Sequence, residues 1–341
     1  MRRLVLPLAL CALLAAACDE TATSPDPDVA PDAASKAMFK RTKALTEMDQ
    51  SPIYRDFSEW DARLREEGLN LRLAKYEYVT LGATGQAGRE VIASDRNKQL
   101  PYQWVAGDPR RGGATSLFWT IDGTEGATSL GAGLTQAQTD QATADAMQTW
   151  QDVKCSNIPL VQLPNIPADV GLAQAILGFG GAFAIVADYL HAGFLPPAFF
   201  EVLAEGGGDG ILGVTFTWFC SELGAPPEDL DGDGFSDACY TETYYNDNFV
   251  WLIDAPANLF GPIDVETVVV HEAGHAISQG HFGDIFFDPA NAFQLGGKFF
   301  FRHLHFAPHA VMNAVIFETQ QKLTGSDIGG HCSIWGSWPN N

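Results

Sequence analysis

Hydrophobic and polar positions alternate near the start of the chain in a pattern that predicts a helix followed by a strand. Ser58 and Asp61 are typical of a helix start, Glu59 to Glu67 fit the helix, and Gly68 ends it. The next segment has the two-residue period of a strand, with apolar side chains at Leu71, Leu73, Tyr76 and Tyr78.

A second group of elements is predicted beyond residue 112. Residues 116–121 fit a strand, and Thr135 with Gln138 forms a capping box for a helix that runs to about Val153. Its inner face carries Ala146, Met147 and Trp150. Apolar segments at 158–163 and 211–219 predict further strands. This mixture of helices and strands indicates an α+β protein.

One apolar stretch, Gly171 to Leu190, is long enough to raise the question of a membrane span. Gln174, Asp188 and the glycine-rich run 178–181 argue against one. We expect a buried segment or an insertion there.

The first 18 residues have the pattern of an export signal. Arg2 and Arg3 precede an apolar run that is too short to cross a membrane, and small residues then lead to Cys18. This end resembles a bacterial lipobox, in which Cys18 becomes the lipidated first residue, with ordinary signal cleavage as the alternative. Residues 19–35, acidic and rich in proline, fit an extended tether. We therefore expect an exported cell-envelope lipoprotein, anchored in a membrane on the periplasmic or the outer side, or released from it.

Charge excludes one class of partner. The chain has 20 basic and 42 acidic side chains and a net charge of −22, and the loss of Arg2 and Arg3 with the signal makes it more negative. Nucleic acid is therefore not an expected partner. Such acidity suits calcium, saline surroundings or cationic substrates.

Two of the six cysteines, Cys11 and Cys18, lie in the export signal. The other four are Cys155, Cys220, Cys239 and Cys332. In an exported protein they are expected to form two disulfides, for which three pairings exist. Cys220 with Cys239 is the preferred pair.

The most informative motif spans residues 271–281, His-Glu-Ala-Gly-His-Ala-Ile-Ser-Gln-Gly-His. On a helix, His271 and His275 lie on one face and can bind one metal ion, and Glu272 can act as general base toward water at that metal. His281 can join them only if the helix ends and the chain turns, for which Gly280 is a candidate. Three protein ligands leave one position open, which is typical of catalytic zinc.

Other third ligands are conceivable. A glutamate could come from Glu318, and an aspartate from Asp284 or Asp288. A second histidine cluster, which we interpret as loop or strand residues near the cleft, comprises His303, His305 and His309.

The zinc motif resembles that of the metzincins, and within them of the matrixins, whose motif is followed by a methionine turn. Residues 310–314 around Met312 fit that turn, residues 263–270 resemble the approach to the motif, and 326–336 resemble the C-terminal stretch. The resemblance implies a metzincin-like fold with a mixed, twisted sheet, the motif on an active-site helix, and a smaller C-terminal subdomain after His281. It also implies that Met312 lies beneath the metal. Where the family has glycine, this chain has Ser278. If the turn needs a left-handed backbone, a side chain there costs about 1 to 2 kcal/mol.

The resemblance also implies roles for the flanking regions. Residues 113–341 would form the catalytic domain, with 210–218 as an edge strand that pairs with extended substrate and 313–317 lining the specificity pocket. A core strand is the alternative reading of 210–218. Residues 36–112 resemble an accessory or propeptide-like region. Arg111 stands where the family's latency motif has its zinc-binding cysteine, so a thiolate switch is not expected.

Alternate aspartates mark a possible calcium loop. The candidate ligands are Asp229, Asp231, Asp233, the carbonyl of Phe235, and Asp237. Gly234 permits the bend, and the twelfth position is Tyr240, so this is not a standard EF-hand. A solvated acidic turn is the alternative.

These observations predict a zinc metalloendopeptidase that hydrolyses polypeptides, with Glu272 as the base. A metal-dependent amidase acting on cell-wall peptides is a second enzyme class that fits. The alternative outside enzymes is a lipid-anchored adhesion or binding module whose metal site is structural or degenerate.

Overall fold

The computed structural model describes residues 57–82, 88–92, 102–124, 133–221, 229–256, 261–282, 285–287, 300–301 and 309–340. Predictions that concern the signal, Cys18, the tether, Asp284, Asp288, His303 and His305 lie outside these residues. In the part of the chain that is described, no helix has the length and apolar character needed to cross a membrane.

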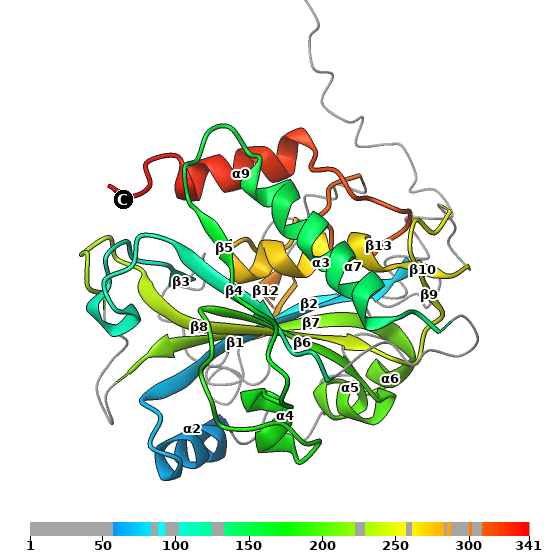
Figure 1. Cartoon of the computed structure of the whole chain (residues 1–341), viewed down its shortest axis with the longest axis horizontal. Helices are drawn as coiled ribbons and strands as arrows, with labels where there is room; N and C mark the ends of the chain where they lie inside the picture. Colours follow the sequence, from blue (N-terminus) through cyan, green and yellow to red (C-terminus); the bar gives the residue numbers. More distant parts are fainter. Residues whose placement is uncertain are drawn as a thin grey trace, which may run out of the picture. The chain divides into compact units, whose positions relative to one another are not determined.

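An 11-stranded mixed sheet forms the centre of the described structure, which confirms the α+β prediction (Figure 1). Its main path runs β12-β11-β2-β1-β7-β8-β6-β4-β5, while β13 pairs with β1 and β3 with β8. The strands are β1 (Leu71–Leu81), β2 (Arg89–Ile92), β3 (Tyr102–Gln103), β4 (Leu117–Ile121), β5 (Leu160–Gln162), β6 (Tyr189–Leu195), β7 (Ile211–Cys220), β8 (Ser236–Asn246), β11 (Ile285–Phe287), β12 (Phe300–Phe301) and β13 (Val315–Ile316). A separate pair joins β9 (Trp251–Leu252) to β10 (Ile263–Asp264).

The sheet crosses the domain boundary expected at residue 112. β1, β2 and β3 come from the accessory region, yet β1 pairs with β7 and β3 with β8. The accessory segment and the predicted catalytic domain thus share one sheet.

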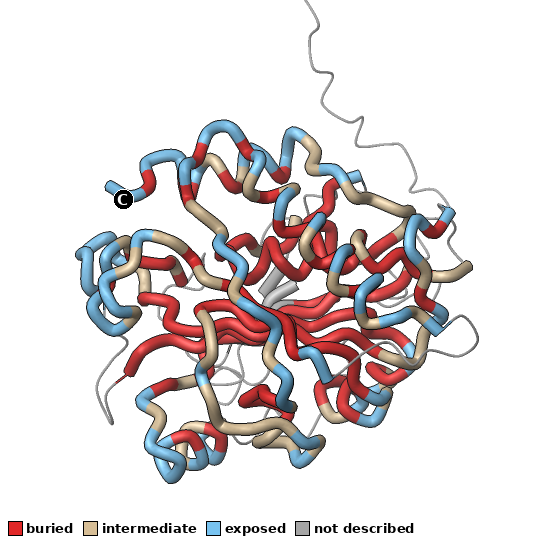
Figure 2. Tube along the Cα trace, viewed as in Figure 1, coloured by how far each residue is buried: buried red, intermediate tan, exposed pale blue. Residues whose placement is uncertain are grey.

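Helices cover both faces of this sheet (Figure 1). One face carries α3 (Gln136–Gln151), α7 (Val265–Ala276) and α9 (Gly325–Trp335), and the other carries α2 (Phe57–Glu66), α4 (Leu172–Leu177), α5 (Pro197–Leu203) and α6 (Gly207–Gly210). Each face has its own apolar core, and Figure 2 shows the sheet buried between the two cores and α7 buried on the side of α3 and α9. The motif that begins at His271 therefore lies on a helix enclosed by the first core.

Local patterns anticipated many of these elements. Thr135 forms the capping box with Gln138, and the buried face of α3 includes Ala146, Met147 and Trp150. Gly68 follows α2 with a left-handed backbone at φ +79°. Residues 171–190 form α4, a loop and the start of β6, in agreement with the predicted buried segment or insertion.

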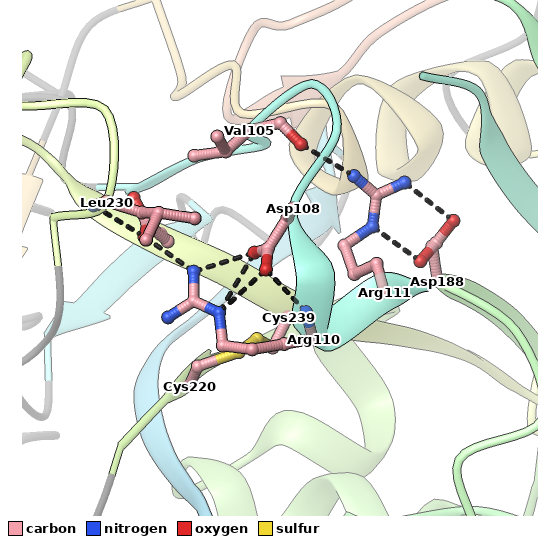
Figure 3. Close-up of a disulfide and its surroundings, with 9 residues drawn as sticks. Val105, Asp108, Arg110, Arg111, Asp188, Cys220, Leu230 and Cys239 are labelled. Carbon is pink, nitrogen blue, oxygen red and sulfur yellow. Dashed lines mark hydrogen bonds and ion pairs between the residues drawn. A yellow bond between two sulfur atoms is a disulfide. The ribbon is translucent and has the colours of Figure 1, made fainter. Parts of the chain in front are cut away.

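Both disulfides join elements of these cores. Cys220 pairs with Cys239 across β7 and β8, as preferred from the sequence, and Cys155 pairs with Cys332 on α9. The first lies beside a cluster of arginines and aspartates (Figure 3).

His331 on α9 is expected to make folding sensitive to acid. Its side chain is fully buried, its Nε2 lies 2.7 Å from Ser156 Oγ, and burial lowers its pKa from 6.5 to about 4. Below pH 6.5 the unfolded chain binds a proton that the folded chain does not, so stability falls as pH drops from 6.5 toward 4. At pH 5 the loss from this group is about 2 kcal/mol relative to pH 7.5.

Urea unfolding at pH 7.5 and pH 5 measures this effect. The variant His331→Gln should lose less stability than the wild type over that interval. Equal losses in the two proteins would contradict the assignment.

Candidate metal centre

Helix α7 fixes the spacing of the first two histidines. Asp264 caps its start by accepting the Thr267 amide at 2.9 Å. Along the helix, His271 and His275 lie four residues apart and both are buried. The two rings therefore face the same point.

The end of α7 brings in the third histidine. Ser278 has a left-handed backbone with φ +74°, its amide donates to the His275 carbonyl at 2.9 Å, and the Gln279 amide donates to the Gly274 carbonyl at 2.9 Å. These two bonds are those of a Schellman motif, which reverses the chain at a helix end. Of the two positions considered for the turn, the structure therefore has it at Ser278 and not at Gly280.

Relieving the strain at Ser278 is expected to stabilise the protein. Glycine adopts the left-handed region without steric cost, so Ser278→Gly should raise the free energy of unfolding by about 1 kcal/mol, and Ser278→Ala should not. Urea denaturation of the two variants checks this. A Ser278→Gly protein no more stable than Ser278→Ala would show that the turn carries no strain.

The three histidines converge through their Nε2 atoms. His271 Nε2 lies 3.0 Å from His275 Nε2 and 3.1 Å from His281 Nε2, and the last two are 3.0 Å apart. Tetrahedral zinc with bonds of 2.0 to 2.1 Å places its nitrogens roughly 3.3 Å apart. The observed triangle is therefore close to the size that zinc requires.

The hydrogen bonds that the Nδ1 atoms make determine whether the Nε2 atoms carry a proton or a free lone pair. His271 Nδ1 donates to the Val311 carbonyl at 2.6 Å, and His275 Nδ1 donates to the Gln279 carbonyl at 2.7 Å. A carbonyl can only accept, so the proton of each neutral ring lies on Nδ1 and Nε2 presents a lone pair. Burial lowers the pKa of His271 to about 3, which keeps its ring neutral. When His271 and His275 are neutral, their Nε2 lone pairs therefore point toward the centre of the triangle, where a cation could bind.

The other candidate ligand that the structure describes stands apart from this triangle. Glu318 pairs with His309 at 2.7 Å on the surface, and neither belongs to the metal-binding group formed by His271, His275 and His281. His281 is thus the third member of the site.

Two residues beyond the motif hold the ligands in position. Met312 is fully buried and packs against Gly274, where a side chain would collide with its sulfur atom. Asp327 on α9 accepts the amides of Val311 and Met312, both at 3.0 Å. The carbonyl of Val311 in turn orients His271. The sequence indicated the region of Asp327 but not this role.

Glu272 is held by a hydrogen-bonded group on the sheet. Thr215 on β7 donates to Glu272 Oε2 at 2.6 Å, and Thr215 Oγ1 lies 2.7 Å from Thr243 Oγ1 on β8. Burial raises the pKa of Glu272 to about 8, against the opposing charge of His275 and the hydroxyl of Thr215. These threonines carry no sequence signal beyond lying in apolar strands.

Removing the Thr215 hydroxyl is expected to destabilise the protein. Thr215→Val leaves the buried carboxyl group of Glu272 without one hydrogen-bond partner and should cost about 2 kcal/mol. Thr217 supplies a matched control, because it is buried on the same strand and, among the described residues, its hydroxyl has no hydrogen-bond partner. Thr217→Val should be nearly neutral in chemical denaturation, and equal losses in both variants would exclude a specific role for Thr215.

β1 covers this site. It pairs antiparallel with β7 from Leu71 opposite Cys220 to Thr80 opposite Ile211. β7 is therefore an internal strand, and the expectation of a free edge there was wrong for this structure. The side chains of the three histidines and Glu272 are at most 5% exposed.

A buried ion pair on β1 reaches the metal ligands. Glu77 Oε2 lies 2.7 Å from Lys75 Nζ and 3.1 Å from His275 Nδ1, and both β1 side chains are at most 2% exposed. Burial alone would raise the pKa of Glu77, but the charges of His275 and Lys75 lower it to about 2. No sequence pattern indicates this pair, because Lys75 and Glu77 lie about two hundred residues before the motif.

The proposed calcium loop is only partly assembled. Asp229, Asp231 and Asp237 bring carboxylate oxygens within 4.8 Å of one another. Asp233 instead accepts the Phe235 amide at 2.7 Å and is not part of that group. Gly234 has φ +89°, in agreement with its predicted bend.

Arg111 takes part in a structural ion pair. It binds Asp188 through Nε at 2.7 Å and Nη2 at 2.9 Å, and the adjacent Arg110 binds Asp108 and Asp237, both at 2.6 Å (Figure 3). These contacts anchor residues 109–111 to the sheet.

Comparison with known proteins adds no family: neither a family model nor a curated protein matches this sequence.

Proposed function

We propose that this protein is a zinc-dependent endopeptidase with a matrixin-like catalytic site. The observation that carries the proposal is the triangle of three Nε2 atoms, 3.0 to 3.1 Å apart, on and just after a helix that also carries Glu272. Three imidazoles and an adjacent carboxylate form the donor set of catalytic zinc rather than of a closed structural site.

His271, His275 and His281 would hold the ion. When bound, zinc supplies Lewis acidity that polarises a scissile carbonyl and makes water acidic near neutral pH. The Nδ1 bonds to the carbonyls of Val311 and Gln279 keep two of the rings in the tautomer that binding requires.

Glu272 is the proton carrier in this proposal. It accepts a proton from the attacking water molecule and returns it to the amide nitrogen that leaves. Thr215 occupies Oε2, while Oε1 has no hydrogen-bond partner among the described residues, so one carboxylate oxygen is available for this transfer. Burial raises the pKa of Glu272 well above its usual 4.5, which makes the ionised carboxylate a stronger proton acceptor.

The family resemblance supports the same proposal. Met312 packs under α7 at Gly274, as a methionine turn would. Ser278 departs from the family glycine but adopts the left-handed backbone of the turn. The left-handed backbone at Ser278 costs about 1 to 2 kcal/mol of folding free energy. This is small beside the roughly 10 kcal/mol that zinc binding can contribute to folding.

A second function is favoured by the burial of the site. Ligands that are at most 5% exposed also suit a structural or degenerate metal centre in a lipid-anchored binding module. In that case zinc would stabilise the fold and no peptide would be cleaved. An amidase acting on cell-wall peptides would share the zinc site and differ in substrate.

One experiment separates these functions. The mature chain is assayed on casein, quenched peptides and cell-wall peptides. Cleavage of polypeptides that a chelator abolishes and zinc restores supports the endopeptidase. Bound zinc without turnover supports the binding module, and turnover confined to cell-wall peptides supports the amidase.

The remaining proposals concern the anchor and calcium. Lipidation at Cys18 would attach the chain to a membrane of the cell envelope, and Cys18→Ala should release it. Calcium held by Asp229, Asp231 and Asp237 would stabilise the loop that precedes β8 by binding the folded state.

A further inference from the structure

A line of buried polar side chains extends from Glu272 across three strands of the sheet. Thr215 on β7 donates to Glu272 Oε2 at 2.6 Å, and its hydroxyl lies 2.7 Å from the Thr243 hydroxyl on β8. The Tyr189 hydroxyl on β6 lies 3.0 Å from Thr243 Oγ1 and 3.3 Å from His191 Nδ1. All five residues are at most 3% exposed. The line therefore connects Glu272 to His191 through the interior of the protein.

Strand pairing brings these groups together. Thr215 is the partner of Thr243 in the antiparallel pair of β7 and β8, and Thr243 is the partner of His191 in the parallel pair of β8 and β6. Tyr189 and His191 lie two residues apart, so both side chains are on one face of β6. All three strands are internal in the sheet. The polar line is thus held by the main-chain pairing of neighbouring strands.

When Glu272 is ionised, the hydroxyl groups of this line donate in one direction. Each hydroxyl carries a single proton. Thr215 uses its proton at the carboxylate, so Thr243 must donate to Thr215, and Tyr189 must donate to Thr243. Burial raises the pKa of Tyr189 above its usual 10, so this side chain keeps the proton that it donates. Every link then points toward Glu272 Oε2.

The proton of Thr215 has other acceptors within reach. Thr215 Oγ1 lies 3.2 Å from the carbonyl oxygen of Glu272 and 2.7 Å from Thr243 Oγ1. Tyr189 removes the second competitor, because a Thr243 oxygen that accepts from Tyr189 can give its own proton to Thr215. Without the Tyr189 hydroxyl, the Thr243 oxygen would lose a donor and would compete with the carboxylate for the proton of Thr215.

His191 and Tyr245 form the far end of the line. The Tyr245 hydroxyl on β8 lies 2.8 Å from His191 Nδ1, closer than the Tyr189 hydroxyl at 3.3 Å. Burial lowers the pKa of His191 to about 3, so its ring is neutral. Tyr245 is therefore the nearer partner of the ring, and the proton of Tyr189 is left for Thr243.

We propose that Tyr189 and Thr243 are positioning residues for Glu272, which direct the Thr215 proton to Oε2 and leave Oε1 to accept the proton of the attacking water. This inference rests on the proposed function. The last torsion of a glutamate side chain is broad, so a carboxylate without a fixed donor at one oxygen can turn. A displacement of about 1 Å at a catalytic group can lower the rate about 100-fold.

The test measures kcat, KM and zinc content of the full mature chain with a quenched peptide as substrate. Tyr189→Phe removes only the hydroxyl, and we expect kcat to fall about 10-fold to 100-fold while KM and zinc content stay unchanged. Thr243→Val should behave in the same way, whereas Thr243→Ser, which keeps the hydroxyl, should keep most of the wild-type kcat.

Thr241→Val is the matched control. Thr241 is buried two residues before Thr243 on the same strand, and its hydroxyl has no hydrogen-bond partner in the part of the chain that the structure describes. This variant should keep the wild-type kcat.

A double variant separates a positioning role from a structural one. Once Thr215→Val has removed the hydroxyl that contacts Glu272, Tyr189→Phe should lower kcat no further, because both residues act through the same proton. An unchanged kcat in Tyr189→Phe would overturn the proposal, as would losses that multiply in the double variant or an equal loss in Thr241→Val. A wild type that holds zinc but cleaves no peptide would remove the endopeptidase proposal and this one together, whereas an active wild type with unaffected variants would remove this one alone.

Discussion

Glu272→Gln is expected to abolish peptide hydrolysis while leaving zinc bound. Glutamine preserves the shape of the side chain but cannot accept the proton of the attacking water, and general-base catalysis is typically worth 100-fold to 10,000-fold. We expect turnover to fall at least about 1,000-fold in the form of the protein that cleaves peptides. Zinc content should stay at one ion per chain, because the three histidines are untouched.

Glu266→Gln is the matched control for that variant. Glu266 lies in the first turn of the same helix and is only partly buried. It should retain both turnover and zinc. Full activity of Glu272→Gln in a preparation with verified zinc content would remove Glu272 from the mechanism.

His281→Ala is expected to weaken zinc binding by about 1,000-fold or more. Changes to residues that only orient metal ligands typically cost 10-fold to 100-fold, and the loss of a ligand should exceed that. The variant should also be less stable in the presence of zinc, since binding contributes to folding. Competition with a chromophoric chelator measures the affinity directly.

His309→Ala provides the comparison within the chain. His309 is exposed, contacts Glu318 and lies outside the metal-binding triangle, so its removal should leave zinc affinity unchanged. Equal affinity in His281→Ala and His309→Ala would show that the third ligand comes from elsewhere.

Local sequence patterns were sufficient to predict the elements that build the site. The capping box at Thr135 and the alternation of apolar side chains over residues 71–78 depend only on neighbours along the chain. The structure has α3 at the first and β1 at the second. The histidine spacing likewise places His271 and His275 on one helical face. Such features follow from backbone geometry over a few residues.

What lay beyond prediction depends on contacts between distant segments. Periodicity identifies β1 as a strand but says nothing of its partners, so it gave no sign that β1 would join β7 and cover the centre. The supporting roles of Asp327 and Thr215 arise in the same way, from segments that meet only in the folded chain. Ser278 shows a different limit. Glycine is the usual residue for a left-handed turn, so Gly280 was a natural candidate, but the fold places the turn at Ser278.

Zinc K-edge X-ray absorption on the purified mature chain tests the central claim most directly. The account predicts one zinc ion per chain, with three imidazole nitrogens at 2.0 to 2.1 Å and a fit that drops to two in His281→Ala. A chain that binds no zinc after loading, or a spectrum with fewer than three imidazoles in the wild type, would contradict it.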